Sequence, residues 1–376
     1  EGFTGFLRNL LLFEPDSRLY LLAADGTVLA KASYREDERD EKVIWTMSLR
    51  KGASWQTVFT TASAIETPSL WGVTPDGQAI VIDTWDNAEK LWRPTPVSLV
   101  DGKLGAFIGP AVEQDVLIGD DGVVLAFTRR KDEADEYEFV EPRMKALWPA
   151  YRNAFKGQQV TLASWTPDFR KLILFVTGPS SPGGYYIADT TTRRVDPIGS
   201  PYPKIAAADV GVVRIVRYRA TDGLEIEGVL TLPKGKAEKN LPLIVLPHGG
   251  PRAHDAVTFD WWAQAIASRG YAVLQPNFRG STGYGNAFKE AGYGEWGAKM
   301  QTDLSDGVAH LADGVGAVEG DVCGEVAGGC GGEDLVRLEA IVLPDRRKVA
   351  VKPAAILRCK MASAVADWVR TDIAPL

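Results

Sequence analysis

The feature that most constrains the fold is a repeated pairing of a tight turn with an apolar strand. Four segments in the first half of the chain share it: EPDSRLYLLAADG (14–26), TPDGQAIVIDT (74–84), GDDGVVLAFT (119–128) and TPDFRKLILFVTG (166–178). Each joins a turn rich in Pro, Asp or Gly to a run of β-branched and large apolar residues. They begin ~45 to 60 residues apart, close to the ~40 to 50 residues of a four-stranded propeller blade. Helical periodicity is nearly absent, so we expect residues 1–210 to form an all-β domain.

We interpret this domain as a partial, propeller-like structure of about four blades. Large rings can fill the space between stacked sheets, and six tryptophans accompany the repeats: Trp45, Trp55, Trp71, Trp85, Trp92 and Trp165. A β-sandwich with chance similarity between its turns is the alternative, although a sandwich seldom needs ~200 residues. A complete propeller has about four to eight blades, so the count leaves open whether the ring closes.

Near residue 212 the pattern changes, and strands begin to alternate with helices. VVRIVRYRATDGLEIEGVLTLP (212–233) predicts two strands joined at an Asp-Gly turn. Its polar face is expected to carry Glu225, Glu227 and Thr231. A buried strand (243–246), an amphipathic helix (261–268) and a second strand (271–276) follow. Alternating strands and helices indicate an α/β sheet, so a domain boundary is expected near 205–215.

The strand at 243–246 runs directly into a loop that contains His248, Gly249, Gly250 and Pro251. In open α/β sheets the chemistry lies at the carboxyl ends of the strands. Glycines allow backbone N–H groups to approach a ligand closely, where they can stabilise a developing oxyanion. We therefore expect this loop to be a donor site; a simple turn of the chain is the alternative.

Residues 212–313 resemble the catalytic domain of the prolyl oligopeptidase family of serine peptidases, especially its acylaminoacyl peptidase and dipeptidyl peptidase branch. The resemblance rests on LPLIVLPHGGP, FDWWAQAIASRGYAVLQPNFRGSTGYG and AGYGEWGAKMQTDLSDGV, in that order. It implies a β-propeller in front of an α/β-hydrolase domain. It also implies hydrolysis of short peptides by a serine nucleophile through an acyl-enzyme.

The resemblance assigns roles to particular positions. The loop of His248, Gly249 and Gly250 is similar to the family's loop that borders the oxyanion site. NFRGSTGYG (277–285) resembles the loop that lines the substrate entrance, with Arg279 expected to be a structural ion-pair residue. Asp303 and Asp306, three apart on the next predicted helix, are expected to form a solvated face or a capping cluster rather than an acid/base pair.

The catalytic pattern is broken further along the chain. An α/β-hydrolase needs a G-x-S-x-G nucleophile turn directly after a buried strand, followed by an acid and then a histidine. The chain contains no Gly-x-Ser-x-Gly; the nearest candidate is Gly328-Gly329-Cys330-Gly331-Gly332, with a thiol in place of the hydroxyl. Gly324 and Glu325 are poor residues for the central strand that should precede it. All three histidines (His248, His254, His310) lie before Cys330, so it is only a weak candidate nucleophile.

The last segment, residues 315–376, has no evident similarity to the sequences of that family. We expect residues 211–314 to be the first part of an incomplete α/β-hydrolase-type domain, with the chain truncated or its reading frame changed near Gly314. We therefore interpret the chain as one that resembles this peptidase family but is itself inactive. A non-catalytic peptide-binding remnant, or a fragment without independent function, is the alternative.

Charge and cysteine content exclude several other classes. A net charge of -7 argues against nucleic-acid and anionic-membrane partners, so a short peptide is the expected ligand. Gly314-Val315-Gly316 lacks the third glycine of a dinucleotide loop, and Cys323 and Cys330 lack the spacing of a metal site, so we expect no cofactor and no metal. Three cysteines favour the cytoplasm. The oligomeric state stays open.

Overall fold

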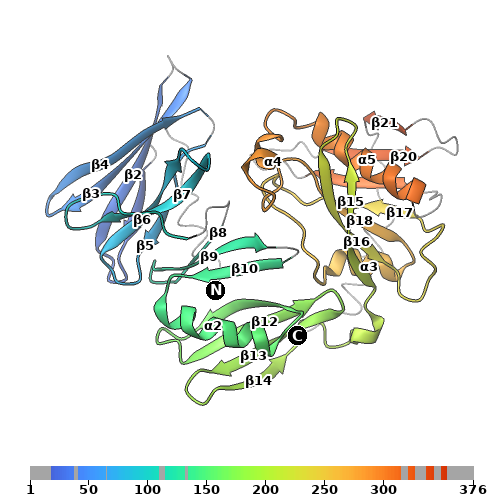
Figure 1. Ribbon diagram of the computed structural model, residues 1–376, viewed down its shortest axis with the longest axis horizontal. Helices are drawn as coiled ribbons and strands as arrows, with labels where there is room; N and C mark the ends of the chain where they lie inside the picture. The colour runs from blue at the N-terminus through green and yellow to red at the C-terminus, as the bar shows by residue number, and fades with distance from the viewer. Residues whose placement is uncertain are drawn as a thin grey trace. The chain divides into compact units, whose positions relative to one another are not determined.

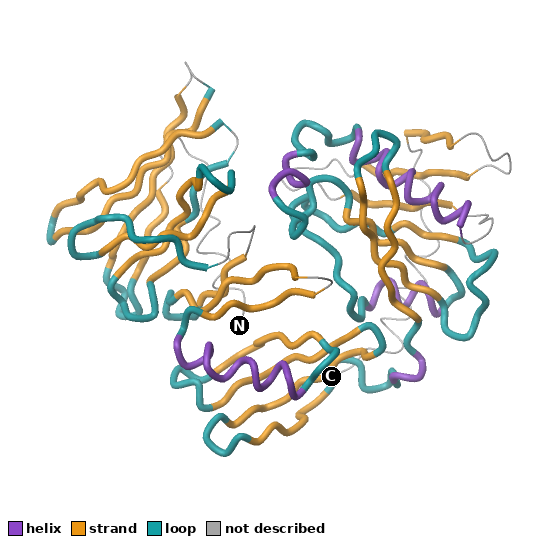
Figure 2. Tube along the Cα trace, in the orientation of Figure 1, coloured by secondary structure: helices purple, strands orange, loops and turns teal. Residues whose placement is uncertain are grey.

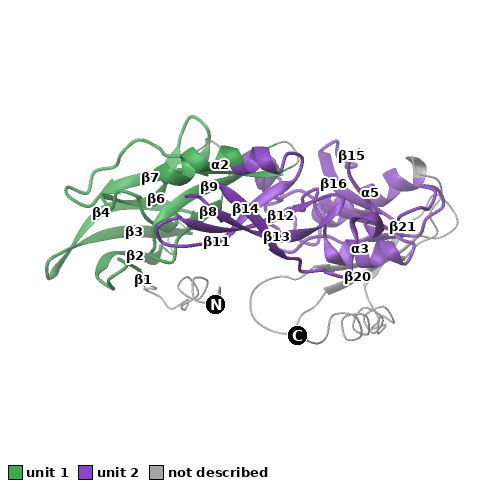
Figure 3. Cartoon of the chain, turned by 90° about the horizontal axis from the view of Figure 1, so that it is seen from below, with its two compact units in different colours: residues 1–150 green, residues 151–376 purple. Residues whose placement is uncertain are grey.

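The computed structural model describes residues 18–37, 41–64, 66–109, 115–131 and 134–314, together with three later strands. It divides into two compact units, residues 1–150 and 151–376 (Figure 3). Within the described part of the chain, no helix combines the length and the hydropathy of a membrane-crossing segment.

The first unit contains three antiparallel sheets (Figures 1 and 2). The first sheet has the order β1-β2-β3-β4, with strands at Arg18–Leu22, Val28–Asp37, Lys42–Lys51 and Ser54–Ser63. The second has the order β5-β6-β7, with strands at Leu70–Val73, Ala79–Asp86 and Leu91–Ser98. The third has the order β10-β9-β8, with strands at Asp115–Ile118 (β8), Val124–Lys131 (β9) and Ala134–Phe139 (β10).

Consecutive sheets of this unit pack face to face. Ile80 and Ile82 of β6 join a core with Trp45 and Met47 of the first sheet. Val81, on the opposite face of β6, packs with Val124 and Phe127 of the third sheet. This alternation follows from the two-residue period of a strand, and it makes β6 an interior strand with both faces covered. Of the six tryptophans expected between sheets, Trp45 and Trp71 lie in these cores, whereas Trp85 is 38% exposed and lies in neither, so the expectation was wrong for Trp85.

The repeated turns share one hydrogen bond, in which an aspartate Oδ1 accepts from the backbone N–H two residues later, at 2.9 to 3.1 Å. Thr74 Oγ1 donates to Asp76 Oδ1 at 2.6 Å, and the Gly77 N–H donates to the Thr74 carbonyl at 2.8 Å. Thr166 Oγ1 donates to Asp168 Oδ1 in the same way, at 2.8 Å. In the first sheet the equivalent turn is Ala23–Thr27, where Asp25 Oδ1 accepts from Thr27 N at 2.9 Å. The quoted EPDS stretch lies outside the described residues, so the first repeat is the AADGT turn that joins β1 to β2.

A helix interrupts the strands where none was predicted. α2 (Pro142–Ala154) begins with a proline, and Glu141 accepts from the Met144 N–H at 2.6 Å and so caps its first turn. Met144, Trp148 and Tyr151 recur at helical spacing and are buried. The repeated pattern of turns and strands gave no indication of this amphipathic helix.

The second unit opens with a fourth antiparallel sheet in the order β11-β12-β13-β14. Its strands are Gln159–Trp165, Lys171–Gly178, Ser181–Asp189 and Arg194–Gly199, and a 3-10 turn (Ala207–Asp209) follows. Four sheets therefore precede residue 210 in the described part of the chain. The alternation of strand and helix begins after them, at β15.

The mixed sheet that follows has the order β15-β16-β18-β17. Its strands are Val212–Arg219 (β15), Glu225–Leu232 (β16), Leu243–Val245 (β17) and Ala272–Asn277 (β18). α5 (Lys299–Gly314) packs on the face that carries Leu274, and α3 (Trp261–Ser268) packs on the face that carries Val273. Adjacent residues of β18 thus contact helices on opposite faces, which makes three layers. Because β16 is covered on both faces, Thr231 is 1% exposed, and its predicted place on a polar face was wrong.

Two further elements complete the described chain. The short helix α4 (Asn286–Glu290) precedes α5. Three strands, β19 (Asp321–Val326), β20 (Val336–Val342) and β21 (Val349–Pro353), form an antiparallel sheet in that order, and β19 contacts β17. The segment from 321 to 326 is thus a strand, but it lies at the edge of a separate antiparallel sheet and is not a central strand of the mixed sheet, in keeping with Gly324 and Glu325.

Candidate substrate-binding site

The candidate site is built from the loops that follow β17 and β18. These strands are parallel, with Leu243 opposite Ala272 and Val245 opposite Leu274. Parallel neighbours end at the same edge of a sheet, so the His248 loop and the loop at 277–285 emerge side by side. The Thr282 N–H donates to the Ala253 carbonyl at 3.0 Å, which ties the two loops together.

His248 is the main link between these loops. Its Nε2 lies 2.9 Å from Ser281 Oγ, its Nδ1 lies 2.9 Å from the Gly249 carbonyl, and its ring stacks on Phe278 with centroids 4.8 Å apart. Ser281 donates its hydroxyl proton to the Phe278 carbonyl at 2.6 Å. Burial lowers the pKa of His248, although the hydrogen bond to the Gly249 carbonyl opposes that shift.

The pair of Ser281 and His248 has the separation of a nucleophile and its base, but it is not accessible. Ser281 is 0% exposed, and its hydroxyl already donates to a carbonyl. A substrate carbonyl cannot reach this oxygen without rearrangement of the loop. The contact therefore positions His248 and the glycines that follow it.

Gly249 and Gly250 are exposed beyond this anchor. Gly250 has a φ of 128°, a conformation that side chains disfavour, and a Cβ at this position would lie 2.6 Å from the Arg252 nitrogen. A second histidine supports the same loop, since His254 Nδ1 lies 2.9 Å from Thr282 Oγ1. An exposed backbone held between two histidine contacts is an arrangement that can receive a polar ligand.

The first half of the 277–285 loop is interior rather than part of an entrance. Asn277, fully buried at the end of β18, accepts from the Asp255 N–H at 2.7 Å and donates to the Asp255 carbonyl at 3.0 Å. It also donates to Tyr284 Oη at 2.7 Å, and that hydroxyl donates to Glu227 at 3.0 Å. The sequence alone did not indicate roles for Asn277 and Tyr284, whose only signal was their place within NFRGSTGYG.

Arg279 lies in a buried ion-pair network. Its guanidinium donates to both oxygens of Asp303 at 2.7 and 2.8 Å, and to both oxygens of Asp222 at 2.9 and 3.0 Å. These carboxylates raise the pKa of Arg279, and the guanidinium holds the pKa of Asp222 well below its usual range. Asp303 is 0% exposed, so its predicted place on a solvated face was wrong. Asp306 instead accepts from the backbone and hydroxyl of Thr221.

Close contact between two glycines joins the second and third of the motifs quoted above. A Cβ on Gly292 would lie 2.6 Å from the Gly280 Cα and 2.8 Å from the end of Met300. Glycine is therefore required for the backbone of AGYGEWG to pack against that of NFRG. This contact holds the 277–285 loop against the AGYGEWG segment.

Cys330, the weak nucleophile candidate, lies outside the described residues. The described strand β19 leads toward it and contacts β17. Among the residues that are described, no three His, Cys, Asp or Glu side chains are grouped so that they could hold a metal ion.

Comparison with known proteins finds a family similarity for part of this site. The model of the prolyl oligopeptidase family matches residues 257–334, which include the 277–285 loop and α5. Over this segment the chain is similar to the prolyl oligopeptidase family. The match extends beyond residue 314, where the resemblance was expected to end, and so includes Cys330.

Among curated relatives, dipeptidyl aminopeptidase BIII of Pseudoxanthomonas mexicana is 35% identical over 181 residues, which are 46% of this chain and 26% of that protein. The human acylamino-acid-releasing enzyme is 38% identical over 64 residues, 17% of this chain and 9% of that enzyme. The chain thus spans about a quarter or less of the length of these prolyl oligopeptidase family relatives.

Solved structures share the fold at lower identity. A puromycin-hydrolyzing peptidase of Mycobacterium tuberculosis has a TM-score of 0.54 at 19% identity, covering 77% of this chain and 47% of the peptidase. Prolyl oligopeptidase B from Galerina marginata, bound to a 35mer substrate, has a TM-score of 0.57 at 15% identity and covers 82% and 45%. These two matches cover 77% and 82% of this chain, so they include the antiparallel sheets as well as the mixed sheet.

Proposed function

We propose that this chain carries the substrate-receiving part of a peptidase that acts on short peptides, but that these 376 residues do not complete the catalytic apparatus. In the full reaction a serine attacks the peptide carbonyl, a histidine transfers the proton, and backbone donors hold the oxyanion. The proposal assigns the last of these roles to the loop of His248, Gly249 and Gly250. Arg279 serves that loop as a structural residue.

The anchored loop is the observation that carries this proposal. His248 and His254 each contact a hydroxyl of the neighbouring loop at 2.9 Å, while Gly249 and Gly250 stay exposed between those contacts. Preorganised backbone donors contribute more to catalysis than mobile ones, because they need no reorganisation as charge develops. The similarity to the prolyl oligopeptidase family supplies the reaction class.

The missing groups are the reason to expect no turnover. The 376 residues contain no Gly-x-Ser-x-Gly, and no histidine follows Cys330. Loss of members of a catalytic triad lowers the rate by several powers of ten, to about the level supported by binding and the oxyanion site alone. A change of reading frame near Gly314 is our explanation for the missing motif.

A chromogenic dipeptide p-nitroanilide tests this proposal, because the similar proteins include a dipeptidyl aminopeptidase. We expect no release of p-nitroaniline above the buffer rate at any concentration of the chain. Turnover that is lost in Cys330→Ala would instead assign catalysis to the thiol. Translation of the other two frames after residue 314 tests the explanation, and the absence of Gly-x-Ser-x-Gly from both would contradict it.

A non-catalytic peptide-binding protein is the second candidate. The exposed loop favours it, since the donors can bind a peptide carbonyl without cleaving it. A fluorescent dipeptide amide should then bind to the chain and should bind at least about tenfold more weakly to His248→Ala. Equal binding by both would contradict a role for the loop.

The finer architecture is also part of the proposal. The four antiparallel sheets are interpreted as blades of a propeller within residues 1–210, and residues 211–314 as the first part of an α/β-hydrolase-type domain. Face-to-face packing of the first three sheets supports the former, and the three layers around the mixed sheet support the latter. Three cysteines in the chain remain the basis for proposing the cytoplasm.

A further inference from the structure

β15 forms one edge of the mixed sheet. Its inner side pairs with β16 over the whole length of the strand, and among the described strands none pairs with its outer side. An edge strand presents a row of backbone donors and acceptors that another extended chain can use.

The register identifies which residues present those groups. The Ala220 N–H donates to the Leu224 carbonyl at 2.9 Å, so these opposed residues form a hydrogen-bonded pair. In an antiparallel ladder such pairs alternate with pairs that are not hydrogen-bonded. Tyr218 therefore bonds to β16, whereas the N–H and C=O groups of Arg217 and Arg219 point to the outer edge.

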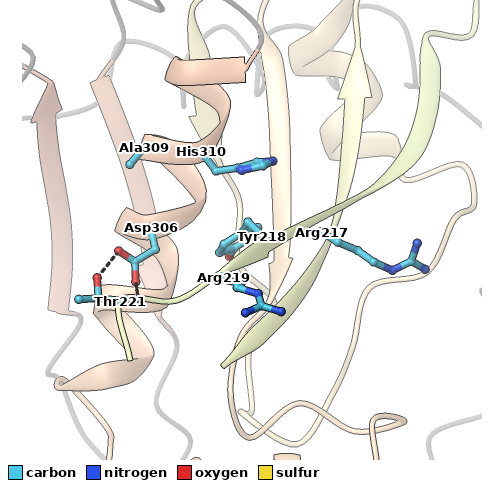
Figure 4. Close-up of a pocket in the computed structure, with 7 residues that line it drawn as sticks. All are labelled: Arg217, Tyr218, Arg219, Thr221, Asp306, Ala309 and His310. Carbon is cyan, nitrogen blue, oxygen red and sulfur yellow. Dashed lines mark hydrogen bonds between the residues drawn. The ribbon is translucent and has the colours of Figure 1, made fainter. Parts of the chain in front are cut away.

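A groove of about 470 Å³ follows this outer edge (Figure 4). One wall is the end of β15 and the turn after it, and the other is α5; the lining residues are Arg217, Tyr218, Arg219, Thr221, Asp306, Ala309 and His310. Figure 4 shows the small side chain of Ala309 and the ring of His310 on the helix wall. The groove therefore lies where an extended backbone would run beside the strand.

Buried contacts hold both walls in place. Tyr218, 3% exposed, donates its hydroxyl to the Asp303 carbonyl of α5 at 2.9 Å. Both oxygens of Asp306 accept from Thr221, from its N–H at 2.7 Å and from its hydroxyl at 2.8 Å. An incoming strand would meet a preformed edge, which lowers the entropic cost of docking.

The charge of the strand selects the kind of occupant. Arg214, Arg217 and Arg219 have side chains that are 42%, 66% and 74% exposed. Each already pairs with a glutamate: Glu238 and Glu225 are exposed, whereas Glu227 is 12% exposed, and ion pairs at the surface are weak. Carboxylates on an added strand can therefore share these arginines, whereas a second copy of β15 would place arginine against arginine.

We propose that the outer edge of β15 docks an acidic extended segment of another protein, which adds a fifth strand to the mixed sheet. Backbone hydrogen bonds to Arg217 and Arg219 provide the attachment, and acidic side chains at alternate positions of the segment select it. This site is separate from the proposed peptidase loop and does not depend on hydrolysis.

The test uses the full chain and a fluorescein-labelled peptide of alternating Glu and Val, followed by fluorescence anisotropy. We expect saturable binding below about 1 mM that weakens as salt is added. A peptide of alternating Lys and Val should not bind. Absence of binding by the acidic peptide, or equal binding by the basic one, would overturn the proposal.

Variants separate backbone from side-chain contributions. Arg217→Pro removes an outward N–H while leaving the ladder to β16 intact, since proline is tolerated where the N–H of an edge strand faces outward. It should weaken binding at least about tenfold, against about threefold for Arg217→Ala, which keeps the N–H. Glu225→Gln should tighten binding, because Arg219 loses its partner. Arg170→Ala, an exposed arginine on another sheet, is the matched control and should change nothing.

The remaining outcomes also test the proposal that a strand is added at β15. Equal binding by Arg217→Pro and Arg217→Ala would overturn the added strand. If Arg217→Pro shows no cooperative melt, the double change of Arg217→Glu and Arg219→Glu replaces it, and binding that this change leaves intact would contradict the proposal. Self-association that Arg217→Pro abolishes, without peptide binding, would assign the edge to a second copy instead.

Discussion

His248 Nε2 lies 2.9 Å from Ser281 Oγ, and this contact joins the two loops that follow the parallel strands β17 and β18. Because Ser281 is fully buried and donates to the Phe278 carbonyl, the histidine is held from below. The anchored side chain of His248 consequently holds the exposed glycines that follow it in place. A lone loop histidine thus has a positional role that does not require it to act as a base.

The protonation of His248 should make stability depend on pH. Burial lowers its pKa in the folded chain, whereas the unfolded value is near ~6.5. Between these two values the unfolded state binds more protons, so the stabilisation present above about pH 6.5 is lost as pH falls through the folded pKa. Urea unfolding at about pH 7.5 and about pH 5 should show this loss in the wild type.

His248→Gln supplies the control for that measurement. Its amide can donate to Ser281 but does not titrate. The difference in unfolding free energy between wild type and variant should therefore shrink or reverse toward low pH. A difference that stays constant from neutral to acidic pH would contradict the lowered pKa.

Asp303 should be the most sensitive position beneath the site. Asp303→Leu leaves the guanidinium of Arg279, itself 3% exposed, without its buried partner, and should reduce the free energy of unfolding by about 3 to 5 kcal/mol. Asp306→Ala removes only contacts with Thr221 at a less buried position and should cost about 1 kcal/mol. Urea denaturation compares the two.

A paired substitution distinguishes charge from packing at the same place. Asp303→Leu combined with Arg279→Met removes both charges and should recover most of the lost stability. If the double variant is as unstable as Asp303→Leu alone, loss of packing and not an uncompensated charge is the cause.

Gly292→Ala should disturb the contact between the two loop motifs. The added methyl would lie 2.6 Å from the Gly280 Cα, so one backbone must move, with a loss of about 1 to 3 kcal/mol. Gly199→Ala is the control, because nothing lies within 4 Å of a Cβ placed there. Thermal melts should show a lower Tm for the first variant alone; equal values would show that the glycine contact is not tight.

In the first unit, Asp83 should produce a pH dependence of the opposite sign. Burial raises its pKa to about 6, although Asp83 accepts from Trp71 Nε1 at 2.9 Å and from Ser69 N at 3.2 Å. A raised carboxyl pKa gives stabilisation that is complete below the unfolded value of 3.8 and is lost as pH rises through about 6.

The rise in the pKa of Asp83 from 3.8 to about 6 corresponds to about 3 kcal/mol in the free energy of unfolding. Hydrogen exchange of the β6 amides should report it locally. Asp83→Asn keeps an acceptor for only one of these two donors, which bind different oxygens of Asp83, but it does not titrate and should remove the dependence on pH. Persistence of the dependence in that variant would assign it to another group.

The alternation of apolar residues and turns was sufficient to predict much of the fold. It identified the sheets before residue 210, the hairpin around Asp222-Gly223, and a helix at 261–268 that the structure reproduces. It failed at α2, because a single amphipathic helix between repeats gives a short signal. It also failed at Thr231 and Asp303, since burial there depends on which elements cover the sheet and on an arginine 24 residues away from Asp303.

The candidate site was predictable only in part. The glycines and His248 were found because they follow a buried strand directly. The partners Ser281, Thr282 and Asn277 were not, because a hydrogen bond between two loops depends on the register of β17 against β18. No tight turn joins these two strands, so the local sequence does not fix that register.

The central claim is that these residues hold the oxyanion loop but no competent nucleophile. Reaction of the purified chain with a fluorescent fluorophosphonate tests it most directly, because an activated hydroxyl or thiol attacks the phosphorus and displaces fluoride without requiring turnover. We predict no labelling above that of the heat-unfolded chain. Stoichiometric labelling of the folded chain, and above all labelling that Cys330→Ala abolishes, would contradict the account.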